Sequence, residues 1–255
     1  MEPLLEVIDH GAIRELRLAH PPVNALRPEL LSSLRESVEA APSEHVRALV
    51  ISGSPGIFSA GLDVRYMLEG GETAALSVFQ ELRALMRALA TSPVPTVAAI
   101  TGHSPAGGAV MAICCDYRVM AEGKFKIGLN EVQVGLSVPP IIHGTLTRLV
   151  GLRNAERMVV SGALLSPQEA LDVGLVDRLV ADLDQVVSSA LEWCEDLLAR
   201  PSQAMLRTRA VARADLVRLY DSPDEVFSDD FTAAWSSEET QATMRGLMAK
   251  LKAKE

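Results

Sequence analysis

Short apolar segments alternate with amphipathic helical segments along this chain, and that alternation limits the possible folds more than any other feature. Residues 48–52 and 96–100 are apolar runs with the length and composition of buried strands. Between them, a helical pattern over residues 73–90 places apolar side chains three and four residues apart, at Leu76, Phe79, Leu82, Leu85, Met86 and Leu89. A strand, a helix and a second strand in this order predict an α/β fold whose strands are joined by crossover connections.

Segments on either side extend the same pattern. Residues 4–8 and 13–18 predict an N-terminal hairpin, because His10 and Gly11 separate two strand-like runs. A helix is expected over residues 28–40, because Pro28 suits a first helical turn. A second helix is expected over residues 106–114 and a strand over residues 117–120. After Gly144 the chain becomes mainly helical. Because no low-complexity linker interrupts this order, we expect one α/β unit with a helical C-terminal part.

The composition argues against a nucleic-acid-binding protein. The chain has 255 residues, enough to bury a sizeable core, and 48% of them are hydrophobic although only 4% are aromatic. The net charge of -9 disfavours DNA or RNA as a main partner, because binding either requires a basic surface. The same charge means that the phosphate groups of any ligand would need local cations.

The three cysteines and the N-terminal residues predict a compartment. Cys114 and Cys115 are adjacent and only one further cysteine occurs, so the pattern indicates small buried apolar residues in a reducing environment. The N-terminal residues lack a basic stretch followed by an apolar core, and no apolar run has the length that spans a bilayer. We therefore expect a cytoplasmic location and no membrane partner.

Two glycine-containing loops have the composition of an oxyanion hole, a pair of backbone N–H groups that stabilises a developing negative charge on oxygen. In residues 59–62 the side chains are small enough for a ligand to approach the backbone closely. Gly107 and Gly108 follow Pro105 and open a helix, so their free N–H groups lie at the positive end of the helix dipole. Each loop alone is typical of an ordinary turn, but both together indicate a site.

Five strings of residues carry a resemblance to a known family: Pro22-Val23-Asn24-Ala25-Leu26, Phe58-Ser59-Ala60-Gly61-Leu62-Asp63, Pro105-Ala106-Gly107-Gly108, Cys115-Asp116-Tyr117-Arg118 and Gly128-Leu129-Asn130-Glu131. They resemble the enoyl-CoA hydratase/isomerase (crotonase) superfamily, and within it they are similar to the short-chain Δ3,Δ2-enoyl-CoA isomerases of mitochondrial β-oxidation and their bacterial relatives. The likeness continues through residues 155–157 and 170–177. It covers the chain from about residue 5 to about residue 180 and is weak beyond about residue 200.

This resemblance implies a fold, an assembly and a partner. The family fold is an α/β spiral of ββα turns followed by a helical trimerisation region, and its members usually form trimers or dimers of trimers. Residues 1–195 are then expected to form the spiral core with the active site, and residues 196–255 the helical C-terminal region of the same unit. We expect a homotrimer or hexamer that acts on an acyl-CoA thioester. CoA is part of that substrate, so no separate cofactor is expected.

The resemblance also implies roles for individual residues. The two oxyanion amides of the family fall on Leu62 and Gly107, and its catalytic base falls on Glu131. Its substrate contacts fall on Asn24, Ala25, Leu26, Ala60, Gly61, Leu62, Asp63, Val64 and Asn130. Residues 138–140 are expected to shape the acyl tunnel.

One departure from the hydratases of the family favours double-bond isomerisation. Those enzymes usually carry a second glutamate three residues after the middle glycine of the second loop, where this chain has Val110. Glu131 alone can carry a proton from C2 to C4 of a 3-enoyl-CoA, whereas the addition of water is usually shared by two carboxylates. An apolar pocket should raise the pKa of Glu131 and help it to return the proton.

The expected reaction is therefore conversion of 3-cis- or 3-trans-enoyl-CoA to 2-trans-enoyl-CoA. Two alternatives stay open: hydration or another crotonase reaction on a different acyl-CoA, and acyl-CoA binding without catalysis. A hydrolytic triad of Ser104, His103 and Asp116 is disfavoured, because the second glycine of a nucleophile elbow is missing. Scattered histidines and the lack of a Cys-x-x-Cys pair give no support for a metal site.

The segment 244–254 is the one clearly basic stretch of the chain. Two interpretations of it are open. It is typical of a solvated amphipathic terminus. The resemblance adds that Lys250 and Lys254 could contact the phosphates of CoA near a neighbouring subunit.

Overall fold

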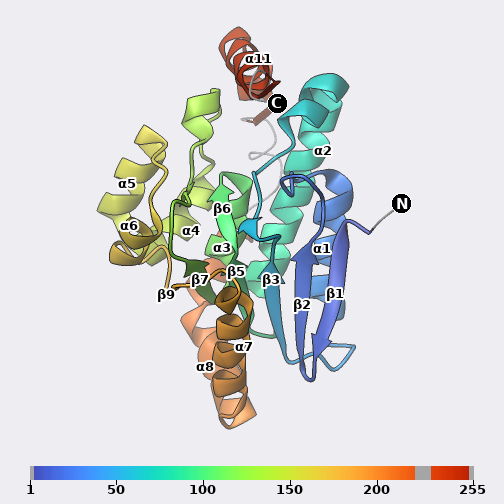
Figure 1. Ribbon diagram of the computed structural model, residues 1–255, viewed down its shortest axis with the longest axis vertical. Coiled ribbons are helices and arrows are strands. Elements are labelled where there is room, and N and C mark those ends of the chain that lie inside the picture. Colours follow the sequence, from blue (N-terminus) through green and yellow to red (C-terminus); the bar gives the residue numbers. More distant parts are fainter. Residues whose placement is uncertain (1–2, 222–230, 253–255) are drawn as a thin grey trace.

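The computed structural model describes residues 3–221 and 231–252, with side chains described as far as residue 250. Its larger sheet has six strands in the order β1-β2-β3-β5-β7-β9. These strands are β1 (Leu5–His10), β2 (Ile13–Leu18), β3 (Ala48–Ser52), β5 (Thr96–Ile100), β7 (Tyr117–Ala121) and β9 (Arg178–Val180). β1 and β2 are antiparallel and each later pair is parallel, so the chain begins with a hairpin and then crosses over repeatedly (Figure 1).

Three successive turns of the chain repeat the order strand, strand, helix. They are β3 with β4 (Gly56–Ile57) and α2 (Val64–Thr91), β5 with β6 (Gly102–Pro105) and α3 (Gly107–Cys114), and β7 with β8 (Ile127–Gly128) and α4 (Pro140–Val150). In each turn the first strand joins the larger sheet, and the second joins a parallel sheet of three strands, β4-β6-β8. This ββα spiral places the carboxyl ends of β4, β6 and β8 along one edge.

Alternate side chains of the larger sheet pack into two hydrophobic layers. Leu49 and Ile51 of β3 belong to a core shared with α1 (Pro28–Ala40), α2 and α3. Val50 belongs to a second core on the other face, which α7 (Gln185–Leu198) covers with Val186 and neighbouring residues. Because successive side chains of a strand point to opposite faces, a parallel strand covered on both sides has to be apolar throughout.

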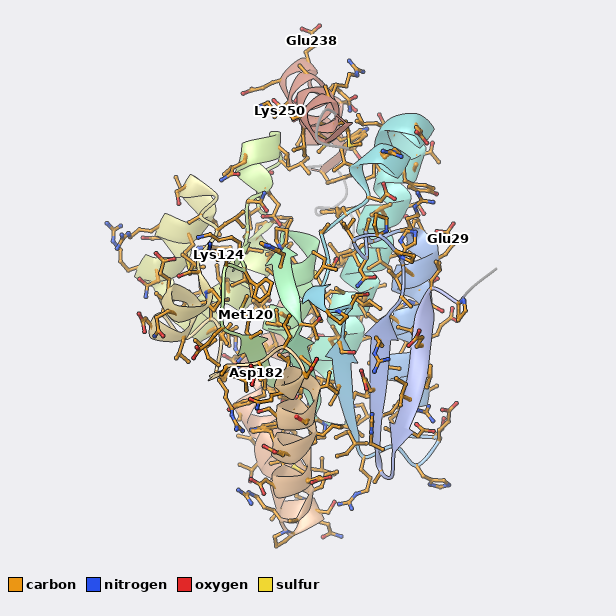
Figure 2. All side chains as sticks on the ribbon, in the orientation of Figure 1. Glu29, Met120, Lys124, Asp182, Glu238 and Lys250 are labelled. Carbon is orange, nitrogen blue, oxygen red and sulfur yellow. The ribbon has the colours of Figure 1, made fainter. Side chains whose placement is uncertain are left out.

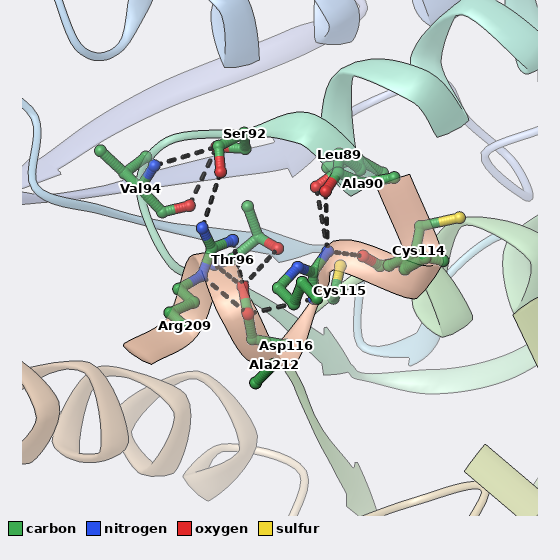
Figure 3. A network of polar contacts seen from close by, with 12 residues as sticks. Leu89, Ala90, Ser92, Val94, Thr96, Cys114, Cys115, Asp116, Arg209 and Ala212 are labelled. Atoms are coloured by element: carbon green, nitrogen blue, oxygen red, sulfur yellow. Dashed lines mark hydrogen bonds and ion pairs between the residues drawn. The ribbon is translucent and has the colours of Figure 1, made fainter. Parts of the chain in front are cut away.

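A buried network of ion pairs attaches the C-terminal helices to this sheet (Figure 3). Asp116, just before β7, accepts hydrogen bonds from Nε and Nη2 of Arg209, both at 2.8 Å, and from Nη1 of Arg213 at 3.0 Å. Arg209 lies on α8 (Ser202–Ala212), and Arg213 immediately precedes α9 (Ala214–Leu219). Arg213 also donates to the carbonyl of Cys114 at 2.8 Å. The network therefore joins α8 and α9 to the end of α3 and the start of β7.

The last described helix, α11 (Glu238–Lys252), lies at the end of the molecule opposite α7 and α8 (Figure 1). Lys250 is an exposed residue of this helix and is labelled in Figure 2. Lys254 lies outside the described residues, so the predicted contact of this basic segment with CoA stays a prediction. Nowhere in residues 3–221 and 231–252 does a helix combine the length and apolarity needed to cross a bilayer.

Most elements expected from the sequence are present with closely similar bounds, including the hairpin, the helix over residues 28–40 and the strands over 48–52 and 96–100. One difference is that α2 begins at Val64, well before the predicted residue 73, and contains a non-helical Gly71 with φ 66°. Another is that β9 occurs in the part of the chain expected to be mainly helical. The predicted boundary between a spiral core of residues 1–195 and a helical region of residues 196–255 stays a prediction, and α7 extends across it.

Candidate active site

Three loops meet at one place because each follows a strand of the smaller parallel sheet. Residues 58–62 follow β4, Ala106 follows β6, and residues 129–131 follow β8. The register pairs Gly56 with Gly102 and Pro105 with Gly128, so the carboxyl ends of the three strands lie at the same edge. Ligands of parallel sheets bind outside that edge.

Two glycines let the first two loops touch. Gly61 has a φ of +88°, which side-chain-bearing residues rarely adopt, and a Cβ atom there would lie 3.3 Å from the backbone nitrogen of Gly107. A Cβ atom on Gly107 would lie 2.8 Å from Cδ1 of Leu26, so a larger residue there would force the Leu26 side chain to move. The close approach of these loops brings the N–H groups of Leu62 and Gly107 near each other.

Neither of these N–H groups has an acceptor within the described part of the chain. Leu26 N–H donates to the Gly61 carbonyl at 2.8 Å, and Asp63 N–H donates to the Leu26 carbonyl at 3.0 Å. This parallel bridge leaves the N–H of Leu62, which lies between the two bonds, unused. Gly107 is the first residue of α3, so its N–H precedes the first hydrogen bond inside the helix. Both groups are free to bind a ligand oxygen.

A largely apolar cavity of about 120 Å³ lies beside these groups. On the side of the three loops it is lined by Ala60, Leu62, Val64, Gly107, Val110, Asn130 and Glu131. The remaining wall is mostly hydrophobic and includes Met67, Phe79, Leu82, Leu136, Ile142, Phe231, Met244 and Leu247. Among the described lining residues, Glu131 is the only one whose side chain titrates near neutral pH.

The carboxyl of Glu131 is buried and has no charged partner among the described residues. Glu131 opens the short 3₁₀ helix η1 (Glu131–Val134), and its Oε2 atom is buried without a hydrogen-bond partner among the described residues. Burial raises the pKa of this carboxyl to about 7, against a lowering effect of a hydrogen bond from its own backbone. A carboxyl with such a pKa can both take and return a proton near neutral pH.

The other predicted substrate contacts shape the loops and do not line the cavity. Asn24 is buried, donates to the Phe58 carbonyl at 3.1 Å and accepts from His20 N–H at 3.0 Å. Asp63 caps α2 by accepting from Tyr66 N–H at 2.9 Å. Ala25, Leu26 and Gly61 are likewise outside the cavity wall. For these five residues, as for the predicted contacts that do line the cavity, binding of substrate stays a prediction.

Much of the apolar wall was missed by reasoning from the motifs. The periodicity of α2 marked Phe79 and Leu82 as inward-facing, but it did not connect them with a cavity. Phe231, Met244 and Leu247 come from the region where the family resemblance is weak. Of residues 138–140, expected to shape the acyl tunnel, Pro139 lines the cavity.

The position of Asp116 contradicts a hydrolytic triad of Ser104, His103 and Asp116. Its two carboxylate oxygens bind Arg209, Arg213 and Thr96, so it is committed to the network at the start of β7. His103 is exposed and packs edge-on against Phe125. Across the residues that the structure describes, no three histidine, cysteine or acidic side chains gather in a group that could hold a metal ion.

Comparison with known proteins assigns this arrangement to a family. A family model described as Enoyl-CoA hydratase/isomerase matches residues 9–254. The chain belongs to the enoyl-CoA hydratase/isomerase family. The mouse protein named enoyl-CoA delta isomerase 1, mitochondrial, is 35% identical over 254 residues, which are 98% of this chain and 88% of the mouse protein. The crystal structure of human mitochondrial delta3-delta2-enoyl-CoA isomerase matches with a TM-score of 0.91 at 33% identity, covering 99% of this chain and 100% of the human one.

These matches confirm the predicted family and its α/β spiral fold. The family contains more than one named activity: a probable enoyl-CoA hydratase of Mycobacterium avium is 33% identical over 214 residues, or 82% of this chain and 79% of that protein. Membership in the enoyl-CoA hydratase/isomerase family therefore leaves the reaction to be argued from the site.

The expected cytoplasmic location is wrong, because the names of similar proteins contradict it. The mouse, human and rat delta isomerases that resemble the chain are all named as mitochondrial proteins. The expectation rested on the lack of a recognisable targeting pattern and on reduced cysteines. Neither property distinguishes one reducing compartment from another.

Proposed function

We propose that this protein is an enoyl-CoA isomerase, which converts 3-cis- or 3-trans-enoyl-CoA to 2-trans-enoyl-CoA in fatty-acid β-oxidation. One observation carries the proposal: within the described residues, Glu131 is the only acid in the cavity wall, and Val110 occupies the position of the second glutamate of many hydratases in this family. The similarity to the mouse and human isomerases supports the same reaction.

In this mechanism Glu131 transfers one proton between two carbon atoms. The C2 proton of a 3-enoyl thioester is acidic because both the thioester and the alkene stabilise the anion. Glu131 removes that proton, the electrons move into a conjugated enolate, and protonated Glu131 returns the proton to C4. The double bond shifts from C3–C4 to C2–C3. A pKa of about 7 suits both steps, because the carboxyl is ready to accept the proton and acidic enough to release it.

The N–H groups of Leu62 and Gly107 would stabilise the enolate oxygen. Both donors are on rigid backbone and need no rearrangement as the thioester oxygen gains charge. Loss of one such donor typically costs about 2.7–4 kcal/mol of barrier lowering. Asn130, which lines the cavity beside Glu131 and whose Oδ1 is buried without a partner among the described residues, would lie next to the acyl group.

The reaction moves one proton and one double bond within a single molecule. It therefore needs no cofactor besides the CoA that the substrate carries. We also propose that the chain assembles as a homotrimer or hexamer, as the family resemblance implies. Light scattering of the purified protein tests the assembly, and a monomer would contradict it.

The deciding experiment compares two substrates with one preparation of the protein. We expect rapid conversion of a 3-enoyl-CoA and slow hydration of crotonyl-CoA. Faster hydration than isomerisation would contradict the proposed reaction. Binding of acyl-CoA without turnover of either substrate would show that the site has lost catalysis.

A further inference from the structure

The hydroxyl group of Ser59 joins two loops close to Leu62. Ser59 is fully buried, and its Oγ donates a hydrogen bond to the Asn24 carbonyl at 2.8 Å. The same oxygen accepts a hydrogen bond from the Gly61 N–H at 3.1 Å. Gly61 directly precedes Leu62, the proposed oxyanion donor. One side chain therefore connects the loop that contains Asn24 to the residue before that donor.

The side chain of Asn24 ties the same two loops in the other direction. Asn24 is buried and has a φ of 51°, in the left-handed region that asparagine adopts more readily than most residues. Its Nδ2 donates to the Phe58 carbonyl at 3.1 Å, and its Oδ1 accepts from the His20 N–H at 3.0 Å. Both polar ends of this side chain are thus bonded to the backbone of the protein.

These hydrogen bonds restrain the backbone on both sides of Gly61. Two planar peptide groups meet at the Cα atom of Gly61, and a glycine lets them rotate more freely than any other residue. The bond from the Gly61 N–H to Ser59 holds the first group. The bond from the Leu26 N–H to the Gly61 carbonyl, at 2.8 Å, holds the second. Because N–H and C=O point in opposite directions in a trans peptide, the Leu62 N–H is fixed pointing away from Leu26.

We propose that Ser59 and Asn24 are positioning residues, whose hydrogen bonds hold the peptide between Gly61 and Leu62 in the orientation in which Leu62 donates to the thioester oxygen. A donor of this kind lowers the barrier most when it is fixed before the charge develops. The inference rests on the proposed function and adds two residues to its machinery. It gives Asn24 a role through the loop of Ser59 in place of the predicted contact with substrate.

The test observes the thioester carbonyl of a bound ligand that cannot be isomerised. Infrared difference spectroscopy of hexanoyl-CoA, with and without a heavy carbon isotope at that carbonyl, isolates its stretching band. A hydrogen bond to the oxygen lowers the frequency of the band, so binding to the unmodified protein should lower it. Ser59→Ala should return the band part of the way towards that of the free ligand.

The same variant is assayed for turnover of a 3-enoyl-CoA. Ser59→Ala should lower kcat by about tenfold, less than the roughly 10²–10³-fold that loss of a whole oxyanion donor costs. KM should change less than kcat, because the substitution removes no contact with the ligand. A role in stability alone would lower the denaturation midpoint of Ser59→Ala and leave the carbonyl band where it is.

Asn24→Gly is the second variant, and Ser104→Ala is the matched control. Glycine adopts a φ of 51° without strain, so Asn24→Gly removes the side-chain hydrogen bonds and should move the band in the same direction as Ser59→Ala. Ser104 is also a fully buried serine, but its Oγ has no hydrogen-bond partner among the described residues. Ser104→Ala should leave both the band and kcat unchanged.

An unmoved band in both folded variants, or an equal shift in Ser104→Ala, would overturn the positioning role. A band that is not lowered by binding to the unmodified protein would overturn it too, because Leu62 would then donate no hydrogen bond. If the bands move as expected but the unmodified protein does not turn over a 3-enoyl-CoA, the positioning role is kept and the isomerase reaction is rejected.

Discussion

Glu131 and Asp116 are both buried carboxylates, yet their surroundings move the pKa in opposite directions. Burial raises the pKa of Glu131 to about 7, and none of the described residues places a cation beside it to oppose this effect. Burial would raise the pKa of Asp116 as well, but the hydrogen bonds from Arg209 and the charge of Arg213 outweigh it, so the pKa is lowered. The partner, and not the depth of burial, decides whether a buried acid can exchange protons.

The comparison also separates a candidate catalytic acid, Glu131, from an acid that stabilises the fold, Asp116. Asp116 compensates two guanidinium groups that are themselves mostly buried. Glu131 compensates nothing in the described residues, and its unpaired Oε2 lies at the cavity. Perturbed acids without a structural partner cluster at functional sites. The four predictions that follow test this division of roles, beginning with the largest effect.

Glu131→Gln should abolish isomerisation while the protein still binds acyl-CoA. The amide keeps the size of the side chain but cannot take a proton, and loss of a general base or acid commonly costs 10²–10⁴-fold. Steady-state turnover of a 3-enoyl-CoA and calorimetric binding of a saturated acyl-CoA separate the two effects. Glu122→Gln, at an exposed position outside the cavity wall, should retain full activity. A Glu131→Gln enzyme with the unmodified rate would remove Glu131 from the mechanism.

Asp116→Asn should destabilise the protein by about 3–5 kcal/mol, because it leaves the buried charges of Arg209 and Arg213 without compensation. Chemical denaturation measures this change. Asp215→Asn is the control, since the pair of Asp215 with Arg148 at 2.7 Å is largely exposed and such pairs contribute about 0–1 kcal/mol. Equal costs for the two substitutions would mean that burial of the network adds nothing.

Glu131→Gln should make the protein more stable at pH 8. The folded pKa of Glu131 is about 7, above the ordinary value of 4.5, so the folded state binds more protons and loses stability as the pH rises through this interval. Removing the acid should recover up to about 3 kcal/mol at pH 8 and little at pH 4. Denaturation midpoints at both pH values give the difference. A variant that is equally affected at both would contradict a raised pKa.

Val110→Glu should introduce weak hydration of crotonyl-CoA. Val110 is buried and lines the cavity, so a carboxyl at this position can face the substrate together with Glu131. We expect about a tenfold gain over background, less than the 10²–10⁴-fold of a positioned acid–base group. Val110→Gln controls for size and polarity. If the glutamine variant hydrates equally well, the gain does not come from a second acid.

Comparison of the sequence with the structure shows which features local patterns can reveal. Strands such as residues 48–52 were predictable because they are apolar throughout, and α1 because Pro28 marks its start. The roles of Leu62, Gly107 and Glu131 were implied by the family resemblance and stay predictions, although the structure brings the three residues to one cavity. Phe231 and Leu247 could not be predicted, since an apolar wall accepts many side chains and forms only when distant segments pack. Arg209 and Arg213 were missed for a similar reason: their partner, Asp116, is far away in the sequence.

The most direct test of the central claim is the pH dependence of kcat/KM for a 3-enoyl-CoA between pH 5 and pH 9. If the unpaired, buried Glu131 is the base, the value should be level above pH 8 and fall about tenfold per pH unit below a midpoint near its pKa of about 7. A value that stays constant down to pH 5, or a midpoint that persists unchanged in the residual activity of Glu131→Gln, would contradict the assignment.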